Sequence, residues 1–202
     1  MILTDTEIKE LIDKQKLTIR PLLDINQIGQ VSIDLRLGYD FLVSVQGRDP
    51  YINASHNSDS KGVYSVNHFF QETRRRLGET ILLYPQQTVL SSTLEYIRLP
   101  KDIMMTIHTR SSYVRLGISV NTIVQPGYCG CISLELTNTN KNTVNLTVGA
   151  PLVQAVLHRV SSETEYLKQG RKYICQVRPK VAMIHEDSDL IRLKQIWERS
   201  KI

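Results

Sequence analysis

The sequence is poor in several features that would narrow its class at once. It has three cysteines and one tryptophan among 202 residues, and aromatic residues make up only 6% of the chain. No apolar run approaches the roughly 20 residues that a membrane-spanning helix requires. The N-terminus has neither the basic start nor the apolar core of a signal peptide. From these absences we expect no membrane span and a soluble, cytoplasmic protein.

The cysteines are few and poorly placed for disulfides or zinc. Cys129 and Cys131 are two residues apart on a predicted strand, where two thiols make a poor disulfide, and Cys175 is an odd third. A reducing compartment fits this usage. None of the five histidines has ligand spacing with the cysteines, as a zinc site would need. We therefore predict no metal site and expect all three thiols to be buried packing residues.

The charge balance suits an anionic partner. The formal net charge is +5 and the pI is about 9.1, which fits nucleic acid or a small polyphosphate. The aromatic residues are scattered and form no ladder on which single-stranded nucleic acid could stack, so we expect no nucleic-acid partner. The densest basic run, at 74–76, is more often a solvated loop than a binding patch.

Hydrophobic periodicity predicts a helix at the start of the chain and β-structure after it. Thr4 and Glu7 have the spacing of a capping box just before an apolar stripe, which is typical of a helix N-terminus. Residues 31–37 alternate apolar and polar side chains, as in a half-buried strand, and residues 41–45 continue the β pattern.

Two regions depart from this β pattern. Residues 46–79 are polar and irregular, so we predict an inserted loop, with a short strand at 63–66 as its one regular element. Residues 186–202 return to a helical period, and we expect this helix to dock on the same chain or on a neighbour.

The middle of the chain is a succession of short strands separated by proline, glycine and asparagine. We predict strands at 80–84, 88–98, 103–108, 131–137, 143–148 and 152–159. Many short strands with little helix favour a sandwich, jelly roll or barrel. The length and the ordinary composition suit one domain over 1–202.

The first candidate for chemistry is the segment RSSYVRLG at 110–117. It holds Arg110, Ser111, Ser112 and Arg115 within eight residues that end on a glycine. Arginine forms forked, charge-assisted bonds with phosphate, and hydroxyls and turn amides add short donors. The segment can therefore cradle a polyphosphate; an ordinary polar helix turn has the same composition.

The second candidate is Glu135, which follows the turn at 126–130 on a strongly β-forming strand. Because strand side chains alternate, Glu135 shares a face with Ser133 and Thr137. A partly buried carboxylate there can act as a general acid and base. The alternative is an unremarkable solvent-facing strand residue.

The third candidate is the basic segment at 170–176, which contains Lys172, Tyr173 and Gln176. These residues can close over an anionic ligand near the C-terminus. A flexible basic loop has the same composition, so this segment alone decides nothing.

Taken in order, these segments resemble the dCTP deaminase family. The matching motifs, which span about 31–180, are S-x-D-x-R-L-G at 32–38, R-S-S-x-x-R-L-G at 110–117, P-G-[FWY]-x-G at 126–130 leading to Leu134-Glu135, and K-Y-x-x-Q at 172–176. The resemblance implies a mainly β fold with a few helices, the dUTPase-like distorted jelly roll or β-clip barrel. It also implies a homotrimer with active sites at the subunit interfaces.

The resemblance also implies roles for particular residues. Glu135 matches the catalytic glutamate, and Arg115 and Ser111 match the groups that hold and polarise the attacking water. The residues expected to bind substrate are Arg110, Ser112, Gln125, Tyr128, Lys172, Tyr173 and Gln176.

The implied reaction converts dCTP to dUTP and ammonia. Glu135 takes a proton from water, the hydroxide attacks C4 of cytosine, and Glu135 returns protons to N3 and to the leaving ammonia. This family works without the zinc that many cytosine deaminases use. We expect Mg²⁺ only as the counter-ion of the triphosphate.

Two departures from the family pattern keep other functions open. Gln125 stands where the family usually has an aspartate before Pro-Gly, and an amide cannot be a general base. This argues against dUTP diphosphatase activity and against direct formation of dUMP. The stretch 118–124 is about three residues shorter than usual, which leaves an inactive nucleotide-binding or regulatory relative as the non-enzyme alternative. Retention of Ser111, Arg115 and Glu135 together favours the enzyme.

Overall fold

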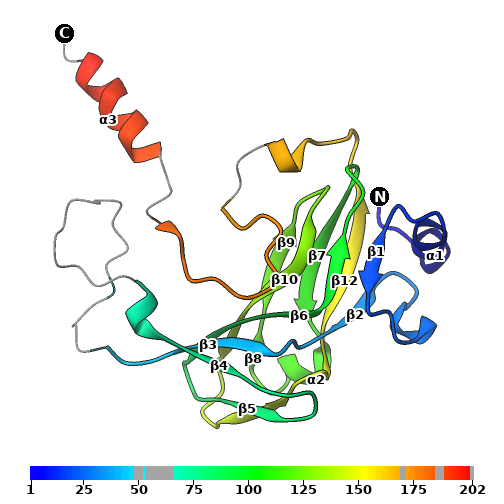
Figure 1. Cartoon of the computed structure of the whole chain (residues 1–202), viewed down its shortest axis with the longest axis horizontal. Helices are drawn as coiled ribbons and strands as arrows, with labels where there is room; N and C mark the ends of the chain where they lie inside the picture. Colours follow the sequence, from blue (N-terminus) through cyan, green and yellow to red (C-terminus); the bar gives the residue numbers. More distant parts are fainter. Residues whose placement is uncertain (48–51, 53–65, 169–171, 185–188, 201–202) are drawn as a thin grey trace.

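The computed structural model shows a β-rich body with one helix packed at its edge and another standing away from it (Figure 1). The structure describes residues 1–47, 52, 66–168, 172–184 and 189–200. The helices are α1 (Asp5–Asp13), α2 (Ser111–Val114) and α3 (Asp189–Arg199), with 3-10 turns η1 (Ile25–Gln27), η2 (Val66–Phe69) and η3 (Tyr166–Lys168). The strands are β1 (Thr18–Arg20), β2 (Ile33–Arg36), β3 (Asp40–Ser44), β4 (Phe70–Arg74), β5 (Thr80–Leu83), β6 (Thr88–Arg98), β7 (Ile103–Thr109), β8 (Ile118–Ser119), β9 (Asn121–Val124), β10 (Cys129–Asn138), β11 (Val144–Thr147) and β12 (Pro151–Arg159).

These strands form two larger sheets and one short pair, all antiparallel. The six-stranded sheet has the order β4-β3-β6-β10-β8, with β1 also paired to β6, and the four-stranded sheet has the order β2-β12-β7-β9. Strands β5 and β11 pair separately. The prediction of a mainly β, jelly-roll-like fold with a few helices is confirmed.

One apolar core joins the two larger sheets. Side chains alternate between buried and exposed along the strands, so Ile103, Met105 and Ile107 of β7 and Leu134 and Leu136 of β10 enter the same buried cluster. Each fully buried aliphatic side chain of this kind contributes about 2 kcal/mol to folding. This core holds β10 rigid, and β10 carries the candidate catalytic carboxylate.

The predicted N-terminal helix and the six predicted central strands are all present. Helix α1 begins at the predicted capping box, in which Thr4 and Glu7 exchange hydrogen bonds. The central strands correspond to β5, β6, β7, β10, β11 and β12 within one or two residues at each end. Strands β1, β8 and β9 were not predicted; β1 and β8, with three and two residues, are too short to show a period of two.

The loop prediction for 46–79 is wrong for its last part. Strand β4 lies there and pairs with β3 along its whole length. Its side chains are mostly exposed, since β4 is the edge strand of its sheet, and backbone pairing without a buried face leaves little trace in the sequence. The predicted strand at 63–66 lies outside the described residues except for Val66, which begins η2.

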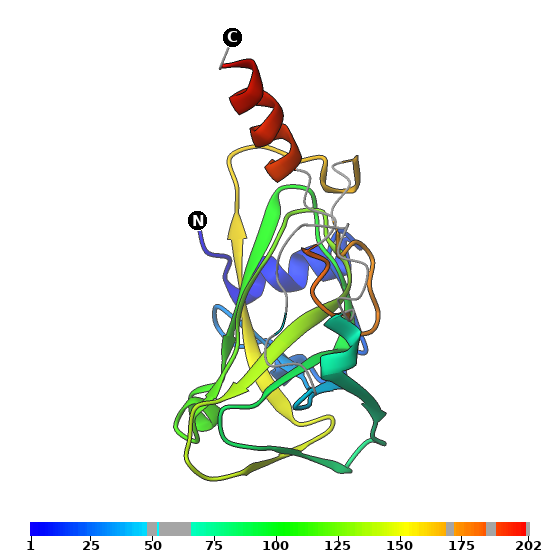
Figure 2. The same ribbon diagram turned by 90° about the vertical axis from the view of Figure 1, so that its left-hand side faces the viewer.

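The C-terminal helix is present as α3, but it does not dock on the described part of the chain. It stands away from the β-body in both ribbon views (Figures 1 and 2). Leu193, Ile196 and Trp197 are 61%, 63% and 59% exposed. Residues 186–188 and 201–202 of the predicted helix lie outside the described residues. Within the described chain, none of the helices has the length and apolarity needed to cross a bilayer.

Candidate active site

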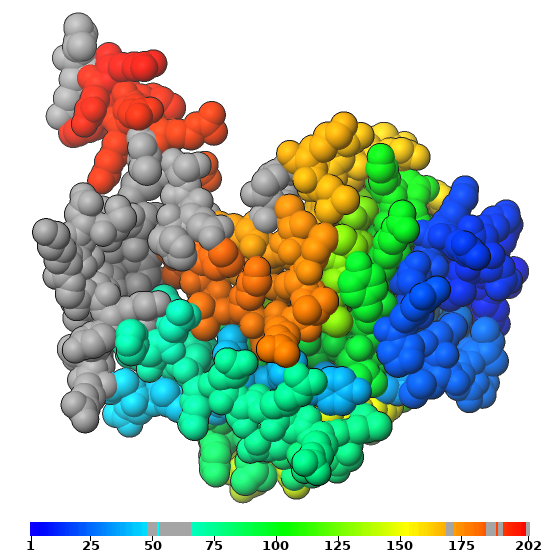
Figure 3. Space-filling view, viewed as in Figure 1, coloured from blue at the N-terminus to red at the C-terminus, as the bar shows by residue number. Residues whose placement is uncertain are grey.

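A cavity of about 580 Å³ opens beside the exposed face of β10. Its walls come from β9, from β10 and from the segment 172–182, which lies against the body (orange in Figure 3). Its volume is in the range of small-molecule sites. The structure brings six of the ten predicted site residues to this cavity: Gln125, Tyr128, Glu135, Lys172, Tyr173 and Gln176.

Glu135 projects from β10 on the side facing away from the core. Leu134 and Leu136 on either side of it are fully buried, and Ser133 lines the same cavity, so the predicted face of the strand is correct. Glu135 itself is exposed in this chain. The partial burial on which the sequence argument depended is therefore not provided by the described part of the chain.

Tyr128 forms a rigid base for this cavity. It is 7% exposed, its hydroxyl donates to the carbonyl oxygen of Cys131 at 2.6 Å, and its ring meets that of Tyr166 with centroids 5.9 Å apart. Burial raises the pKa of the Tyr128 hydroxyl well above its usual value, so the phenol stays neutral. Tyr128 thus lines the cavity while its hydroxyl is bonded within the fold.

The segment 172–182 is attached to β10 by main-chain contact. The Cys131 amide donates to the carbonyl oxygen of Gln176 at 2.8 Å. Gly130, at φ +138°, permits this approach, because a Cβ at Gly130 would lie 2.5 Å from the same carbonyl oxygen. Further along, Arg178 lies 3.6 Å from Asp40.

Within that segment, Tyr173 and Gln176 are held in different ways. The Tyr173 hydroxyl accepts a hydrogen bond from the Met183 amide at 3.0 Å. Gln176 is 5% exposed, and within the described structure its Oε1 has no hydrogen-bond partner. An unsatisfied buried acceptor costs about 1–3 kcal/mol. Because Gln176 lines the cavity, a ligand N–H group can satisfy this oxygen.

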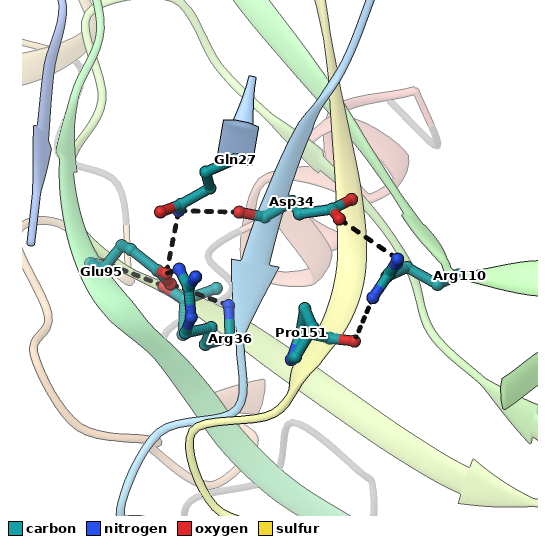
Figure 4. Close-up of polar contacts among 7 residues, drawn as sticks. Gln27, Asp34, Arg36, Glu95, Arg110 and Pro151 are labelled. Carbon is teal, nitrogen blue, oxygen red and sulfur yellow. Dashed lines mark hydrogen bonds and ion pairs between the residues drawn. The ribbon is translucent and has the colours of Figure 1, made fainter. Parts of the chain in front are cut away.

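The 110–117 segment does not line this cavity within one chain. Arg110 is part of the fold: it lies 3.3 Å from Asp34 and donates to the carbonyl oxygen of Pro151 at 3.2 Å (Figure 4). Ser111, Ser112 and Arg115 are exposed. The structure therefore separates the predicted site residues into two groups on one chain.

The shortened stretch at 118–124 still reaches the cavity. It forms β8 and β9, and β9 pairs with β7 at the edge of the four-stranded sheet. Thr122, Ile123 and Val124 line the cavity.

A family model described as dCTP deaminase-like matches residues 2–160 of the sequence. The chain belongs to the dCTP deaminase family. It is 37% identical over 195 residues to a Dictyoglomus thermophilum protein named dCTP deaminase, dUMP-forming, covering 93% of this chain and 96% of the relative. A Methanobrevibacter smithii protein of the same name is 32% identical over 94% and 98% of the two chains. A Halorubrum lacusprofundi protein named dCTP deaminase is 34% identical over 94% of each.

A solved structure supports the fold of this dCTP deaminase family member. The 2'-deoxycytidine 5'-triphosphate deaminase of Agrobacterium tumefaciens matches with a TM-score of 0.58 at 22% identity. The match covers 78% of this chain and 47% of the Agrobacterium chain. The family and the fold inferred from the four motifs are thus confirmed, while the individual site residues stay predictions.

One of the family motifs turns out to be structural. Arg36, in the S-x-D-x-R-L-G segment, contacts Glu95 of β6 through its amide at 2.9 Å and its guanidinium at 3.0 Å, and Gln27 donates to the same carboxylate at 3.1 Å (Figure 4). Glu95 is fully buried, and burial raises its pKa. Glu95 was not predicted from the sequence, although it shares the strand phase of buried Ile97, where a carboxylate indicates a buried ion pair.

The expectation about the cysteines is right for one of the three. Cys131 is buried, Cys129 is partly buried and Cys175 is exposed. Cys175 lies outside the β-core, in the 172–182 segment. Within the described residues, no three His, Cys, Asp or Glu side chains cluster closely enough to hold a metal ion. Independence from zinc remains a prediction.

Proposed function

We propose that the protein deaminates dCTP by hydrolysis, with Glu135 as general acid and base. The observation that supports this most strongly is the cavity that places Glu135 beside the three predicted residues of the K-Y-x-x-Q segment. In a member of the dCTP deaminase family, a carboxylate that lines a cavity of small-molecule size is the expected partner of a bound cytosine.

The reaction needs two proton transfers through one carboxylate. Glu135 takes a proton from water and passes it to N3 of cytosine as the hydroxide attacks C4. Glu135 then moves the second proton from the new hydroxyl to the amino group, the C4–N bond breaks, and ammonia leaves with C4 as a carbonyl. We propose that no zinc takes part and that Mg²⁺ accompanies only the triphosphate.

We further propose that a second copy of the chain completes each site, in a homotrimer. Ser111 and Arg115 must reach Glu135 to hold the water and the tetrahedral intermediate, and one chain does not bring them together. Exposed apolar side chains flank both parts of the divided site: Val114, Leu116 and Ile123, at 54%, 47% and 60% exposure. Such side chains gain stability when another subunit covers them, and that cover would also bury Glu135.

We propose dUTP as the product. Gln125 lines the cavity, and its amide cannot activate a water to attack the phosphate chain. Relatives of similar identity are named dUMP-forming or simply dCTP deaminase, so the product has to be measured on this protein.

The deciding experiment incubates the protein with dCTP and Mg²⁺, with dUTP as a parallel substrate, and separates the nucleotides by ion exchange. We expect dUTP from dCTP and no change in dUTP.

Glu135→Gln is expected to lower turnover at least about a hundredfold while calorimetry still detects dCTP binding. Glu163→Gln, at an exposed carboxylate elsewhere, serves as the matched control and should behave as wild type. Binding without turnover in the wild type would instead support the nucleotide-binding relative, and unchanged turnover in Glu135→Gln would exclude the role of Glu135.

A further inference from the structure

Two cysteines meet where the 172–182 segment crosses β10. The Cys131 amide bonds the Gln176 carbonyl at 2.8 Å, and the absent Cβ of Gly130 would lie 3.2 Å from the Gln176 amide nitrogen. The residues that precede these contacts in each segment are Cys129 and Cys175. Their backbones are therefore held side by side, and both thiols are free.

The two thiols also influence each other. Interaction with the Cys129 thiol, together with some burial, raises the pKa of the Cys175 thiol to about 11. Cys175 is exposed and occupies a positive φ of 51°, which is uncommon for a residue with a side chain. The turn thus holds the Cys175 backbone in a conformation that costs energy.

We propose that Cys129 and Cys175 form a redox-active dithiol, which hydrogen peroxide converts into a disulfide that fixes the 172–182 segment over the cavity. The protein already holds the segment there by weak contacts, the Gln176–Cys131 hydrogen bond and the Arg178–Asp40 pair. A covalent bond one residue before the first of these contacts prevents the segment from lifting.

The chemistry balances with the peroxide as the only co-reactant. The Cys129 sulfur attacks one peroxide oxygen, the O–O bond breaks, and a sulfenic acid and water form. Cys175, which stays protonated until then, attacks the Cys129 sulfur and displaces a second water. Two thiols lose two electrons and two hydrogen atoms, and the peroxide is reduced to two waters.

The consequence for turnover rests on the proposed function. Tyr173 and Gln176 line the cavity on the same segment as Cys175, so a fixed segment blocks the route by which nucleotide enters and leaves. Opening of such a segment often limits turnover. We expect oxidation to slow release of radiolabelled dCTP, chased with unlabelled dCTP, by about tenfold and to slow deamination by a similar factor.

The test treats the reduced full-length protein with hydrogen peroxide, blocks the remaining thiols and digests it with trypsin without reductant. The expected product links the tryptic peptides 116–141 and 173–180 through Cys129, with the loss of two hydrogen atoms. Fragment ions distinguish Cys129 from Cys131. Dithiothreitol should release the link and restore fast nucleotide release.

Cys175→Ser is the matched control, because the residue is exposed and the substitution removes one sulfur. It should form no linked peptide, and its nucleotide release should not respond to peroxide. A wild-type protein whose Cys175 stays a free thiol, or becomes a sulfinic acid without linking to Cys129, would overturn the dithiol. If the linked protein releases nucleotide at an unchanged rate, the proposal that the disulfide closes the 172–182 segment over the cavity is wrong. Failure of the proposed function looks different: the linked peptide forms, but the reduced protein leaves dCTP unchanged.

Discussion

Glu95 is a carboxylate without solvent contact. Its side chain lies on the face of β6 opposite to the one that lines the cavity. It accepts three hydrogen bonds, from the amide and guanidinium of Arg36 and from Gln27. Burial is the larger influence and raises its pKa above the usual 4.5. A carboxyl whose pKa is higher in the folded chain contributes stability below its unfolded pKa, and that contribution is lost as the pH rises through the folded value.

The raised pKa of Glu95 predicts how the difference in Tm between the wild type and Glu95→Gln changes with pH. Gln cannot titrate, so the variant lacks this pH dependence, while the charge of Arg36 is the same in both proteins at every pH used. We expect the Tm of the wild type, relative to that of Glu95→Gln, to fall as the pH rises from about 4.5 towards neutrality. Calorimetric melting of both proteins at several pH values measures this. The opposite slope would show that attraction by Arg36 outweighs burial.

Gln125 is the single residue on which the proposed product depends. An aspartate there would provide a base at the cavity wall, close to where the phosphate chain is expected to lie. We predict that Gln125→Asp converts part of the dUTP, or of the dCTP, to dUMP and pyrophosphate, detectable by ion exchange. Gln125→Asn is the control, since it shortens the side chain equally without adding a base. Equal dUMP formation by both variants would show that the residue at position 125 does not determine the product.

Among the elements, the contact between β10 and the 172–182 segment depends on one glycine. A methyl group at Gly130 would lie 2.5 Å from the Gln176 carbonyl oxygen. We predict that Gly130→Ala displaces the segment, raises KM for dCTP about tenfold through lost positioning, and exposes Lys172 and Lys180 to trypsin.

Gly78→Ala separates this displacement from backbone strain. Gly78 also has a positive φ, of 82°, but an added Cβ would have nothing within 4 Å. This variant should lose about 1–2 kcal/mol of stability from the unfavourable φ and keep the KM and the protease pattern of the wild type. If both variants raise KM equally, the effect comes from general destabilisation and not from the segment.

The same elements show what the sequence can and cannot predict. Strands β6, β7, β10 and β12 were predicted because a buried face imposes alternation over seven or more residues. Strand β4 was missed because it pairs through its backbone at a sheet edge, which selects no side-chain pattern. The candidate site shows the same division: local motifs singled out Glu135 and the K-Y-x-x-Q segment, and the structure brings them to one cavity. They carried no information on whether 110–117 meets them in the same chain.

At the scale of the whole molecule, the divided site is the feature to explain. Glu135 lines the cavity, while Ser111 and Arg115 are exposed elsewhere on the same chain. Helix α3 adds another exposed apolar surface away from the body (Figure 2). Ser111, Arg115 and several apolar side chains are exposed on the single chain. We therefore expect the protein to be active only as an assembly of several chains.

Mixing two inactive chains tests this directly. Glu135→Gln keeps Arg115, and Arg115→Ala keeps Glu135, so a site built from two chains regains both groups when the Arg115→Ala chain supplies its glutamate and the Glu135→Gln chain supplies its arginine. Random assembly after co-refolding should restore about a quarter of the wild-type turnover per site, because each group is intact in half of the chains. Refolding Glu135→Gln with the double variant is the control and should restore none. If the site lies within one chain, no pairing of variants can place an intact Glu135 beside an intact Arg115, and the mixture stays as inactive as its parts.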